Sequence, residues 1–281
     1  MNTLTRSNEV IVTGATGFIG QNLVPLLLSN KYQVTVVTRD SSKVQQFRWS
    51  GKVRIVEFDI HSGNIDVNVE PGTGLIHLAW QGLPDYNAAF HFEENLPHNY
   101  KFIKSLVLSG VNQVLITGSC AEFGSQTGSI ESTTTPQPEN SYAFAKDSLR
   151  KQLEFFGKDY QFCLQWARLY YMYGPGQNPQ SLLPQLDVAI DNNEEIFNMS
   201  GGEQLRDYLP IEEVVKQLFN LYKKNQNGVF NVCSGNPISV RSLVENRIKE
   251  RNSSIKPNFG YYPYTDSEPM SFWGIPDNQK E

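Results

Sequence analysis

The sequence predicts an α/β fold with a doubly wound parallel sheet and a smaller C-terminal lobe. Short β-branched runs alternate with segments of helical periodicity through the first 169 residues, which is typical of βαβ units. From residue 170 the chain becomes rich in aromatic and turn residues. Because 281 residues suffice for one large or two small domains, we predict one unit over residues 1–169 and a smaller one over 170–281.

The individual elements are predicted from residue type and spacing. β-Branched and aliphatic runs predict strands at residues 10–13, 33–38, 53–58, 75–79, 113–117 and 162–168. Helical spacing predicts helices at 18–28, 92–108 and 141–156, the first two despite Pro25 and Pro97. Further along, two helical patterns flank a Gly201–Gly202 turn, and another covers 240–250. A strand pattern at 228–232 indicates that residues 226–235 could return to the main sheet.

Composition limits the classes of function. The net charge of −5 and the charged content of 19% argue against a nucleic-acid polymer as partner. No apolar run approaches the ~20 residues of a membrane span, and residues 1–9 lack the apolar stretch of a signal peptide. Cys120, Cys163 and Cys233 have no metal-type spacing and predict free thiols in a reducing compartment. We therefore expect a cytoplasmic protein without a membrane partner.

A strand that runs through a glycine turn into a helix stands near the N-terminus. Gly14, Gly17 and Gly20 are spaced at i, i+3 and i+6. Gly14 permits the tight turn, Gly17 lets phosphates approach the backbone, and Gly20 lets the helix pack closely on the strand. Free N–H groups and the helix dipole then favour an anion. This stretch predicts a Rossmann-type site for a dinucleotide pyrophosphate.

Tyr142 and Lys146 lie four residues apart in a predicted helix, which places them on one face. That face continues through apolar residues, where an unused lysine is costly. A nearby ammonium favours the phenolate and would lower the tyrosine pKa towards neutrality. Such a pair can exchange a proton with an alkoxide that forms from a ketone. The alternative is an ordinary amphipathic helix whose lysine extends outward to solvent.

Ser119 comes after the predicted strand 113–117, within a glycine-containing turn. Its hydroxyl would lie at the ligand edge of the sheet, where it could bind a substrate carbonyl or the tyrosine oxygen. The alternative is simple turn chemistry.

Taken together, these stretches resemble the extended branch of the short-chain dehydrogenase/reductase superfamily, the epimerase/dehydratase family that works on nucleotide sugars. The resemblance covers essentially the whole chain and implies that Tyr142 is the general acid/base, Lys146 grips the nicotinamide ribose, and Ser119 orients the carbonyl. The matching residues are the three glycines, His77-Leu78-Ala79, Ser119 with Phe123-Gly124, Tyr142 with Lys146, residues 173–176 and Arg206-Asp207-Tyr208.

The resemblance also implies a set of cofactor-binding residues. They are Gly14, Thr16, Gly17, Phe18, Ile19, Gly20, Arg39, Asp59, Ile60, Leu78, Ala79, Trp80 and Asn95, together with Tyr142 and Lys146. In NAD users an acidic residue ends the second strand, but here Thr38 and Arg39 occupy that place. An arginine attracts a 2′-phosphate, so we expect NADP(H). Asp40, one residue further, keeps NAD(H) as the alternative.

Substrate contacts are expected across the cleft. The candidates are Trp80, Gln81, Glu122, Phe123, Tyr171, Asn178 and Arg206. Arg206 would meet the diphosphate of the substrate, since a guanidinium is a bidentate donor; a surface ion pair with Asp207 or Glu203 is the alternative. No metal is expected, because His77 and Cys120 lack further ligands at suitable spacing.

The two residues directly after Ser119 indicate the reaction. Dehydratases of this family carry an Asp-Glu pair there, whereas this chain has Cys120 and Ala121. We therefore expect NADPH-dependent reduction of the C4 ketone of a dTDP-, CDP- or GDP-linked 4-keto-6-deoxyhexose, as in deoxysugar and polysaccharide biosynthesis. Residues 267–274 resemble the ending of such reductases. The alternatives are an NAD-dependent nucleotide-sugar 4-epimerase and a non-catalytic NADP-sensing protein. The resemblance further implies a homodimer formed through helices 92–108 and 141–156.

Overall fold

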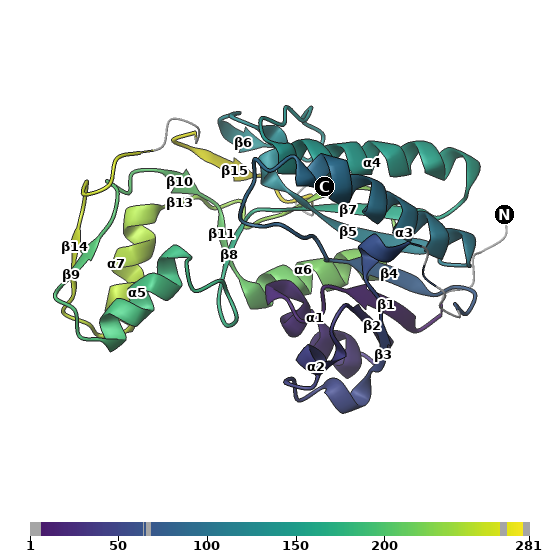
Figure 1. The fold of residues 1–281 in the computed structure, drawn as a ribbon. Coiled ribbons are helices and arrows are strands. Elements are labelled where there is room, and N and C mark those ends of the chain that lie inside the picture. Colours follow the sequence, from purple (N-terminus) through teal and green to yellow (C-terminus); the bar gives the residue numbers. More distant parts are fainter. Residues whose placement is uncertain (1–6, 64, 66–68, 265–268, 278–281) are drawn as a thin grey trace.

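A seven-stranded parallel sheet forms the centre of the larger part of the molecule (Figure 1). The computed structural model describes residues 7–63, 65, 69–264 and 269–277. Strand order is β12-β7-β5-β4-β1-β2-β3, and every neighbouring pair is parallel. The strands are β1 Glu9–Thr13, β2 Gln33–Thr38, β3 Arg54–Glu57, β4 Gly74–His77, β5 Gln113–Ser119, β7 Cys163–Leu169 and β12 Gly228–Val232. The predicted fold class is confirmed, and the order reverses between β1 and β4, where such sheets bind ligands.

Helices cover both faces of this sheet (Figure 1). On one face lie α1 (Phe18–Ser29), the short α2 (Ser41–Val44) and α6 (Ile211–Lys224), and on the other lie α3 (Leu96–Leu108) and α4 (Ser141–Asp159). Each layer buries its apolar stripe, with Leu23 and Leu218 in one core and Phe102 and Leu149 in the other. This burial, rather than helix propensity, holds the helices in place.

The predicted helix 92–108 is a composite. A π-helical turn, η3 (His91–Asn95), leads into α3, and Pro97 lies in the first turn of α3, where its missing N–H costs no hydrogen bond. β4 ends at His77, two residues before the predicted end. Leu78 and Ala79 therefore lie in the loop at the carboxyl end of β4.

A second body is built from α5 (Leu182–Asp191), α7 (Val240–Glu250), β9 (Ile196–Asn198) and β14 (Lys256–Asn258). It has its own apolar core, and Arg247 of α7 forms an ion pair with Asp187 of α5 at 2.8 Å. α6 and β12, although within residues 170–281, pack on the large sheet. The limits 1–169 and 170–281 remain a prediction, and the chain crosses between the two bodies more than once.

Short elements complete the structure. Paired strands β8 (Tyr171–Tyr173) with β11 (Tyr208–Pro210), β10 (Leu205–Arg206) with β13 (Ile238–Ser239), and β6 (Gly128–Ile130) with β15 (Phe272–Gly274) lie between the bodies. The 3₁₀ turns are η1 Ser50–Lys52, η2 Ile60–Ser62 and η4 Cys120–Phe123. Residues 267 and 268 of the reductase-like ending lie outside the described residues. Within the described part of the chain, no helix combines the length and apolarity that a bilayer span requires.

Candidate active site

The glycine turn after β1 has the geometry that its spacing predicts. Gly14 has a φ of +67°, and a Cβ there would lie 2.8 Å from the Ala79 nitrogen. A Cβ on Gly20 would lie 2.3 Å from the Gly14 oxygen, whereas on Gly17 the nearest atom would be 3.3 Å away. The tight turn and the close helix packing are therefore present, and a side chain on Gly17 would crowd the Gly14 carbonyl.

A pocket of about 300 Å³ opens beside this turn, at the carboxyl ends of the central strands. Of the residues predicted to bind the cofactor, its lining includes Gly14, Thr16, Gly17, Arg39, Ile60, Leu78, Ala79 and Trp80. Gln81, expected at the substrate, lines it too. Phe18, Ile19, Gly20, Asp59, Asn95, Tyr142 and Lys146 are not among the lining residues. The glycine backbone at one end and cationic side chains at another fit a phosphate-bearing dinucleotide.

Asp59 and Asn95 lie behind the pocket wall, where they form hydrogen bonds with residues of the wall. The Asp59 carboxylate accepts the backbone N–H of His61 at 3.0 Å and so caps η2. Asn95 is fully buried, and its amide donates to the Gln81 carbonyl at 2.9 Å. Its Oδ1 lies 3.0 Å from Nε2 of His61. Both side chains are thus engaged in holding the loops that line the pocket.

Charged residues from the end of β2 and from α2 form one edge of the pocket. Arg39, Asp40 and Lys43 all line it, and Arg39 donates to Oε1 of Gln81 at 2.9 Å. The Asp40 carboxylate accepts the Ser42 N–H at 3.0 Å, and the hydrogen bond from the Ser42 side chain lowers its pKa. Sequence reasoning missed Lys43. Lys43 lies in α2, which directly follows Arg39 and Asp40 and carries Lys43 to the same edge of the pocket.

Ser119, Tyr142 and Lys146 come together beside Trp80. Ser119 ends β5, while Tyr142 and Lys146 lie in the first turns of α4, which Asn140 caps through the Ala143 N–H at 2.8 Å. The Ser119 and Tyr142 side chains share a hydrogen bond. The Lys146 ammonium donates to the Thr117 carbonyl at 2.8 Å and lies 4.2 Å from the centroid of the Trp80 ring. Since Trp80 lines the pocket, Tyr142 and Lys146 lie behind this part of the pocket wall.

Burial dominates the proton affinities of this group. It raises the pKa of Tyr142, the negative charge of Glu122 adds to the increase, and the Ser119 hydrogen bond opposes it. It also lowers the pKa of Lys146 to about 7, against an opposing effect of Glu122. The prediction that Lys146 lowers the tyrosine pKa towards neutrality is therefore wrong for this structure. Tyr142 holds its proton at neutral pH, the form that a proton donor needs.

Tyr86 and His91 orient the same group, and sequence reasoning missed both. The Tyr142 N–H donates to the Tyr86 carbonyl at 2.9 Å, and the two rings meet edge to face at 5.6 Å. The Trp80 indole donates to Nδ1 of His91 at 3.1 Å. The segment before η3, through Tyr86, therefore packs against Tyr142. Phe58, His61 and Asn99 also line the pocket without having been predicted.

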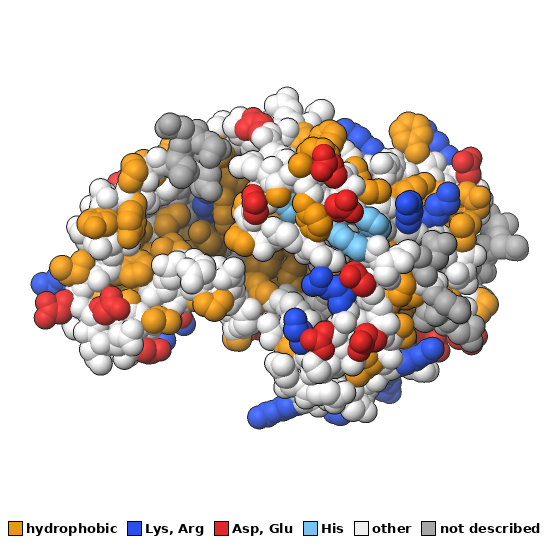
Figure 2. Space-filling view, viewed as in Figure 1, with side chains coloured by type: hydrophobic (Ala, Val, Ile, Leu, Met, Phe, Trp, Pro, Cys, Tyr) orange, Lys and Arg blue, Asp and Glu red, His pale blue; other side chains and the backbone are white. Residues whose placement is uncertain are grey.

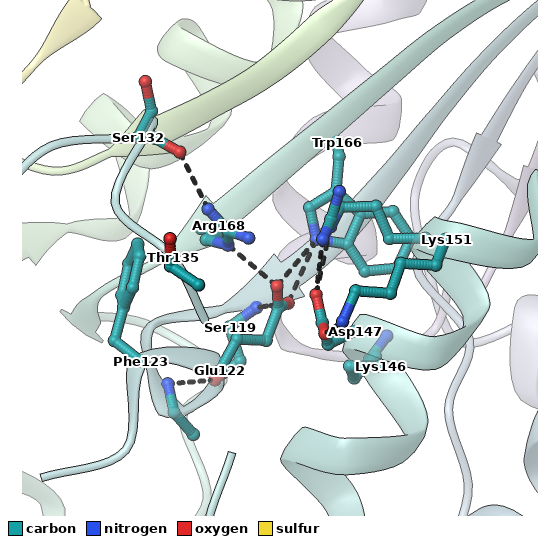
Figure 3. A network of polar contacts seen from close by, with 12 residues as sticks. Ser119, Glu122, Phe123, Ser132, Thr135, Lys146, Asp147, Lys151, Trp166 and Arg168 are labelled. Atoms are coloured by element: carbon teal, nitrogen blue, oxygen red, sulfur yellow. Dashed lines mark hydrogen bonds and ion pairs between the residues drawn. The ribbon is translucent and has the colours of Figure 1, made fainter. Parts of the chain in front are cut away.

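Glu122 and Phe123 do not face the substrate as expected. Both are fully buried. Glu122 forms an ion pair with Arg168 at 2.7 Å (Figure 3), and Phe123 packs in an apolar cluster with Ile130 and Phe272. The expected contact of these two side chains with substrate is wrong, because η4 turns them into the interior.

The remaining substrate candidates lie between the two bodies, where Figure 2 shows the surface hollowed. Arg206 is only 2% exposed, and its guanidinium lies 5.7 Å and 5.5 Å from the ring centroids of Tyr171 and Phe272. Tyr171 is half-buried. The exposed Asn178 accepts the Gln180 N–H at 2.9 Å. Aromatic rings thus cover the Arg206 guanidinium, and its contact with a substrate diphosphate stays a prediction.

The two acidic residues expected as alternative partners of Arg206 each have contacts elsewhere. Glu203 forms an ion pair with Arg241 at 3.2 Å. The Asp207 carboxylate accepts the backbone N–H groups of Ser234 and Gly235 at 2.7 Å and 2.9 Å. Asp207 therefore fixes the loop after β12.

One group of described residues brings possible metal ligands together: atoms of His61, Glu94 and His98 lie within 4.8 Å of one another. The two imidazole rings stack at 4.7 Å with an interplanar angle of 13°. Because stacked rings direct their nitrogen lone pairs into separate planes, we assign no metal to this group. His77 is buried and hydrogen-bonded to Thr13 and Asn99 at 2.9 Å and 2.8 Å.

Comparison with known proteins agrees with this fold and pocket. The chain is 30% identical over 268 residues to a dTDP-6-deoxy-L-talose 4-dehydrogenase (NAD(+)) of Aggregatibacter actinomycetemcomitans, covering 95% of this chain and 99% of that protein. It is 25% identical to a dTDP-4-dehydro-6-deoxyglucose reductase of Escherichia coli, covering 85% and 81%.

The fold is shared with solved structures. A UDP-glucose 4-epimerase from Thermotoga maritima, solved with UDP-glucose, has a TM-score of 0.82 at 23% identity and covers 97% of this chain and 91% of that one. The profile of the NAD dependent epimerase/dehydratase family matches residues 10–233. The chain, with its glycine turn and its grouped Ser119, Tyr142 and Lys146, belongs to the NAD dependent epimerase/dehydratase family.

Proposed function

We propose that this protein reduces the C4 ketone of a nucleotide-diphospho-4-keto-6-deoxyhexose with NADPH. The observation that carries the proposal is the convergence of Ser119, Tyr142 and Lys146 behind Trp80, which lines the pocket. Tyr142 is protonated there, so it can deliver a proton to an oxygen that gains negative charge. Ser119 can hold the same oxygen through its hydroxyl.

The chemistry divides between cofactor and protein. Bound NADPH would supply a hydride to C4. Tyr142 would protonate the C4 oxygen, Ser119 would orient it, and Lys146 would support Tyr142 from the side of Trp80. Burial of Tyr142 and Lys146 strengthens these interactions, because the surroundings screen charge poorly.

Dehydration is disfavoured by the residues after Ser119. Cys120 and Ala121 offer no carboxylate, and burial raises the pKa of the Cys120 thiol to about 12, which makes it a poor base. The next acidic side chain, Glu122, is engaged by Arg168. A relative named as a 4-dehydrogenase of a 6-deoxy sugar supports reduction at C4, since oxidation of that alcohol is the same reaction in reverse.

NADP(H) is the proposed cofactor because Arg39 and Lys43 both line the pocket edge, where a 2′-phosphate would gain two cationic partners. Asp40 on the same edge, together with the NAD(+) in the name of that relative, makes NAD(H) the competing cofactor. We further propose a homodimer in the cytoplasm; the absence of a disulfide among the cysteines of the described residues is consistent with a reducing compartment.

The test is an absorbance screen at 340 nm with NADPH and NADH against dTDP-, CDP-, GDP- and UDP-linked 4-keto-6-deoxy sugars, with NMR of the product. Net NADPH oxidation and a 6-deoxyhexose product are expected. Tightly co-purified NAD and interconversion of two sugars without net oxidation would instead identify a 4-epimerase. Binding of NADPH without turnover on any sugar would favour a non-catalytic sensor.

A further inference from the structure

A buried ion pair lies beneath the turn that carries Ser119. Glu122 is fully buried and Arg168 is 1% exposed, and the Arg168 Nε donates to Oε2 of Glu122 at 2.7 Å. An apolar pair of similar volume would fill this space without the cost of removing two charges from water. Stability alone therefore does not explain a charged pair at this position.

Both carboxylate oxygens of Glu122 are occupied (Figure 3). Oε1 accepts the backbone N–H of Ser119 at 2.9 Å, and the Trp166 indole N–H lies 3.0 Å and 3.2 Å from the two oxygens. Trp166 and Arg168 alternate on β7 and so point to the same face of the sheet. Two side chains of a central strand thus hold this carboxylate in one orientation.

The Arg168 guanidinium has further contacts besides the one with Glu122. Its Nη1 donates to the Ser132 carbonyl at 2.9 Å, and the guanidinium lies 4.6 Å from the centroid of the Phe123 ring. The orientation of Glu122 is therefore set by groups from β7, η4 and the loop after β6.

Ser119 is held reciprocally. Its backbone N–H binds Glu122, while its Oγ accepts the Ala121 N–H at 3.2 Å, which completes a capping box at the start of η4. With the oxygen so fixed, the Ser119 hydroxyl lies where it bonds the side chain of Tyr142. A continuous series of contacts runs from Arg168 through Glu122 and Ser119 to Tyr142.

We propose that Glu122 is a positioning residue for the reduction at C4, an inference that rests on the proposed function. Held by Arg168 and Trp166, its carboxylate keeps Ser119 where one hydroxyl reaches both Tyr142 and the ketone oxygen of the substrate. Glu122 itself touches neither substrate nor cofactor.

The charge of Glu122 acts on the same two groups. It raises the pKa of Tyr142 and opposes the lowering of the Lys146 pKa by burial. Tyr86 and Cys120 also face Tyr142 and raise its pKa, and Ser119 lowers it. Loss of the Glu122 charge should therefore lower the pKa of Tyr142, a change that a purely structural residue would not produce.

The test compares Glu122→Gln with the wild-type enzyme. NADPH affinity, measured by fluorescence titration, and KM for the keto sugar should change by less than about threefold. We expect kcat to fall by about 100-fold, the effect of a displacement of about 1 Å in a reacting group. The basic limb of the kcat profile should move to lower pH. Glu154→Gln is the matched control, since Glu154 also pairs with an arginine, Arg150 at 2.6 Å, but lies partly exposed on α4.

The double variant Glu122→Gln/Arg168→Met separates positioning from folding. It removes the unpaired buried guanidinium, so the Tm should recover while kcat remains low. Recovery of kcat together with Tm would overturn the proposal, as would a Glu122→Gln enzyme with wild-type kcat and pH profile. Absence of turnover by the wild-type enzyme on every 4-keto sugar would instead defeat the proposed function and this inference with it.

Discussion

Tyr142 and Lys146 show how burial alters a familiar pair of residues. In water an ammonium next to a phenol favours the phenolate. Here both side chains are almost fully enclosed, at 8% and 2% exposure, and loss of hydration penalises the charged form of each. The Tyr142 phenol keeps its proton, and the Lys146 amine binds a proton less tightly than it would in water. The site therefore contains a proton donor at neutral pH.

Tyr142→Phe tests this donor. The change removes only the hydroxyl, so NADPH binding should stay within about twofold of wild type. Turnover should fall by about 10²–10⁴-fold, the usual contribution of general acid catalysis. Single-turnover measurement of NADPH oxidation checks the loss, and a variant with near-wild-type rate would rule out Tyr142 as the acid.

Lys146→Met should stabilise the protein while it removes activity. The folded-state pKa of Lys146 is about 7, against 10.5 ordinarily, so the unfolded chain binds more protons between those values. The free energy of unfolding of the wild-type protein should therefore rise as the pH increases from 7 to 10.5. Below pH 7 the buried ammonium destabilises the folded protein to its full extent. At neutral pH the variant should therefore have a higher Tm than the wild-type protein. Thermal unfolding across pH 6–10 measures both effects; a Tm below wild type would contradict the buried-charge explanation.

At the scale of elements, the ends of β2 and β4 determine what the pocket can hold. Arg39 directly follows β2, and Lys43 of α2 lies at the same edge of the pocket. β4 ends at His77, whose ring nitrogens are bonded to Thr13 of β1 and Asn99 of α3. The carboxyl ends of β2 and β4, on either side of β1, thereby each support one wall of the pocket.

The double variant Arg39→Ala/Lys43→Ala tests the cofactor edge. If both side chains contact a 2′-phosphate, NADPH affinity should fall at least about tenfold, since hydrogen bonds to charged groups contribute ~1.5–3 kcal/mol. NADH affinity should change little. Isothermal titration with both cofactors measures the difference, and Lys52→Ala, at an exposed position outside the pocket lining, serves as the control. Equal losses for the two cofactors would exclude 2′-phosphate recognition.

His77 should make the protein sensitive to mild acid. Burial lowers its pKa from 6.5 to about 3, so below pH 6.5 the unfolded chain gains a proton that the folded one does not. Stability should then fall with a limiting slope of about 1.4 kcal/mol per pH unit. Urea unfolding between pH 7 and 5 measures it. His77→Gln should flatten this slope whereas His98→Gln, a more exposed histidine on α3, should leave it intact; an unchanged slope in His77→Gln would refute the assignment.

At the scale of the whole molecule, α3 and α4 form a layer with exposed apolar side chains. Leu108, Phe144 and Phe155 are 54%, 50% and 67% exposed, and large exposed apolar surfaces commonly mark interfaces. In a two-fold dimer formed through this layer, each of these side chains would be buried in both subunits. This agrees with the proposed homodimer.

Phe155→Glu should shift the protein towards monomer, because each two-fold contact would receive two like charges. Sedimentation velocity measures the change. Tyr261→Glu, at a position 58% exposed on the other body, should leave the sedimentation coefficient unaltered. A wild-type monomer, or a dimer unaffected by Phe155→Glu, would exclude this interface.

Local patterns determined most of the fold. The strand and helix order, the glycine turn and the pairing of Tyr142 with Lys146 depend on short-range periodicity and turn chemistry, which a sequence displays directly. Ser119 was placed correctly beside Tyr142 because the carboxyl ends of parallel strands must meet at one edge. The seven-stranded order confirms that argument.

Only the tertiary structure decided which polar side chains face the pocket and which face the interior. Glu122 and Arg206 are both substrate candidates by sequence, yet Arg168 and Trp166 enclose one, and Tyr171 and Phe272 cover the other. The pKa values of Tyr142 and Lys146 likewise depend on desolvation by residues distant in the chain. The physical reason is that burial is a property of the packed chain. Spacing along the sequence specifies the face of its own element to which a side chain belongs. The elements that pack against that face decide whether water remains around the side chain.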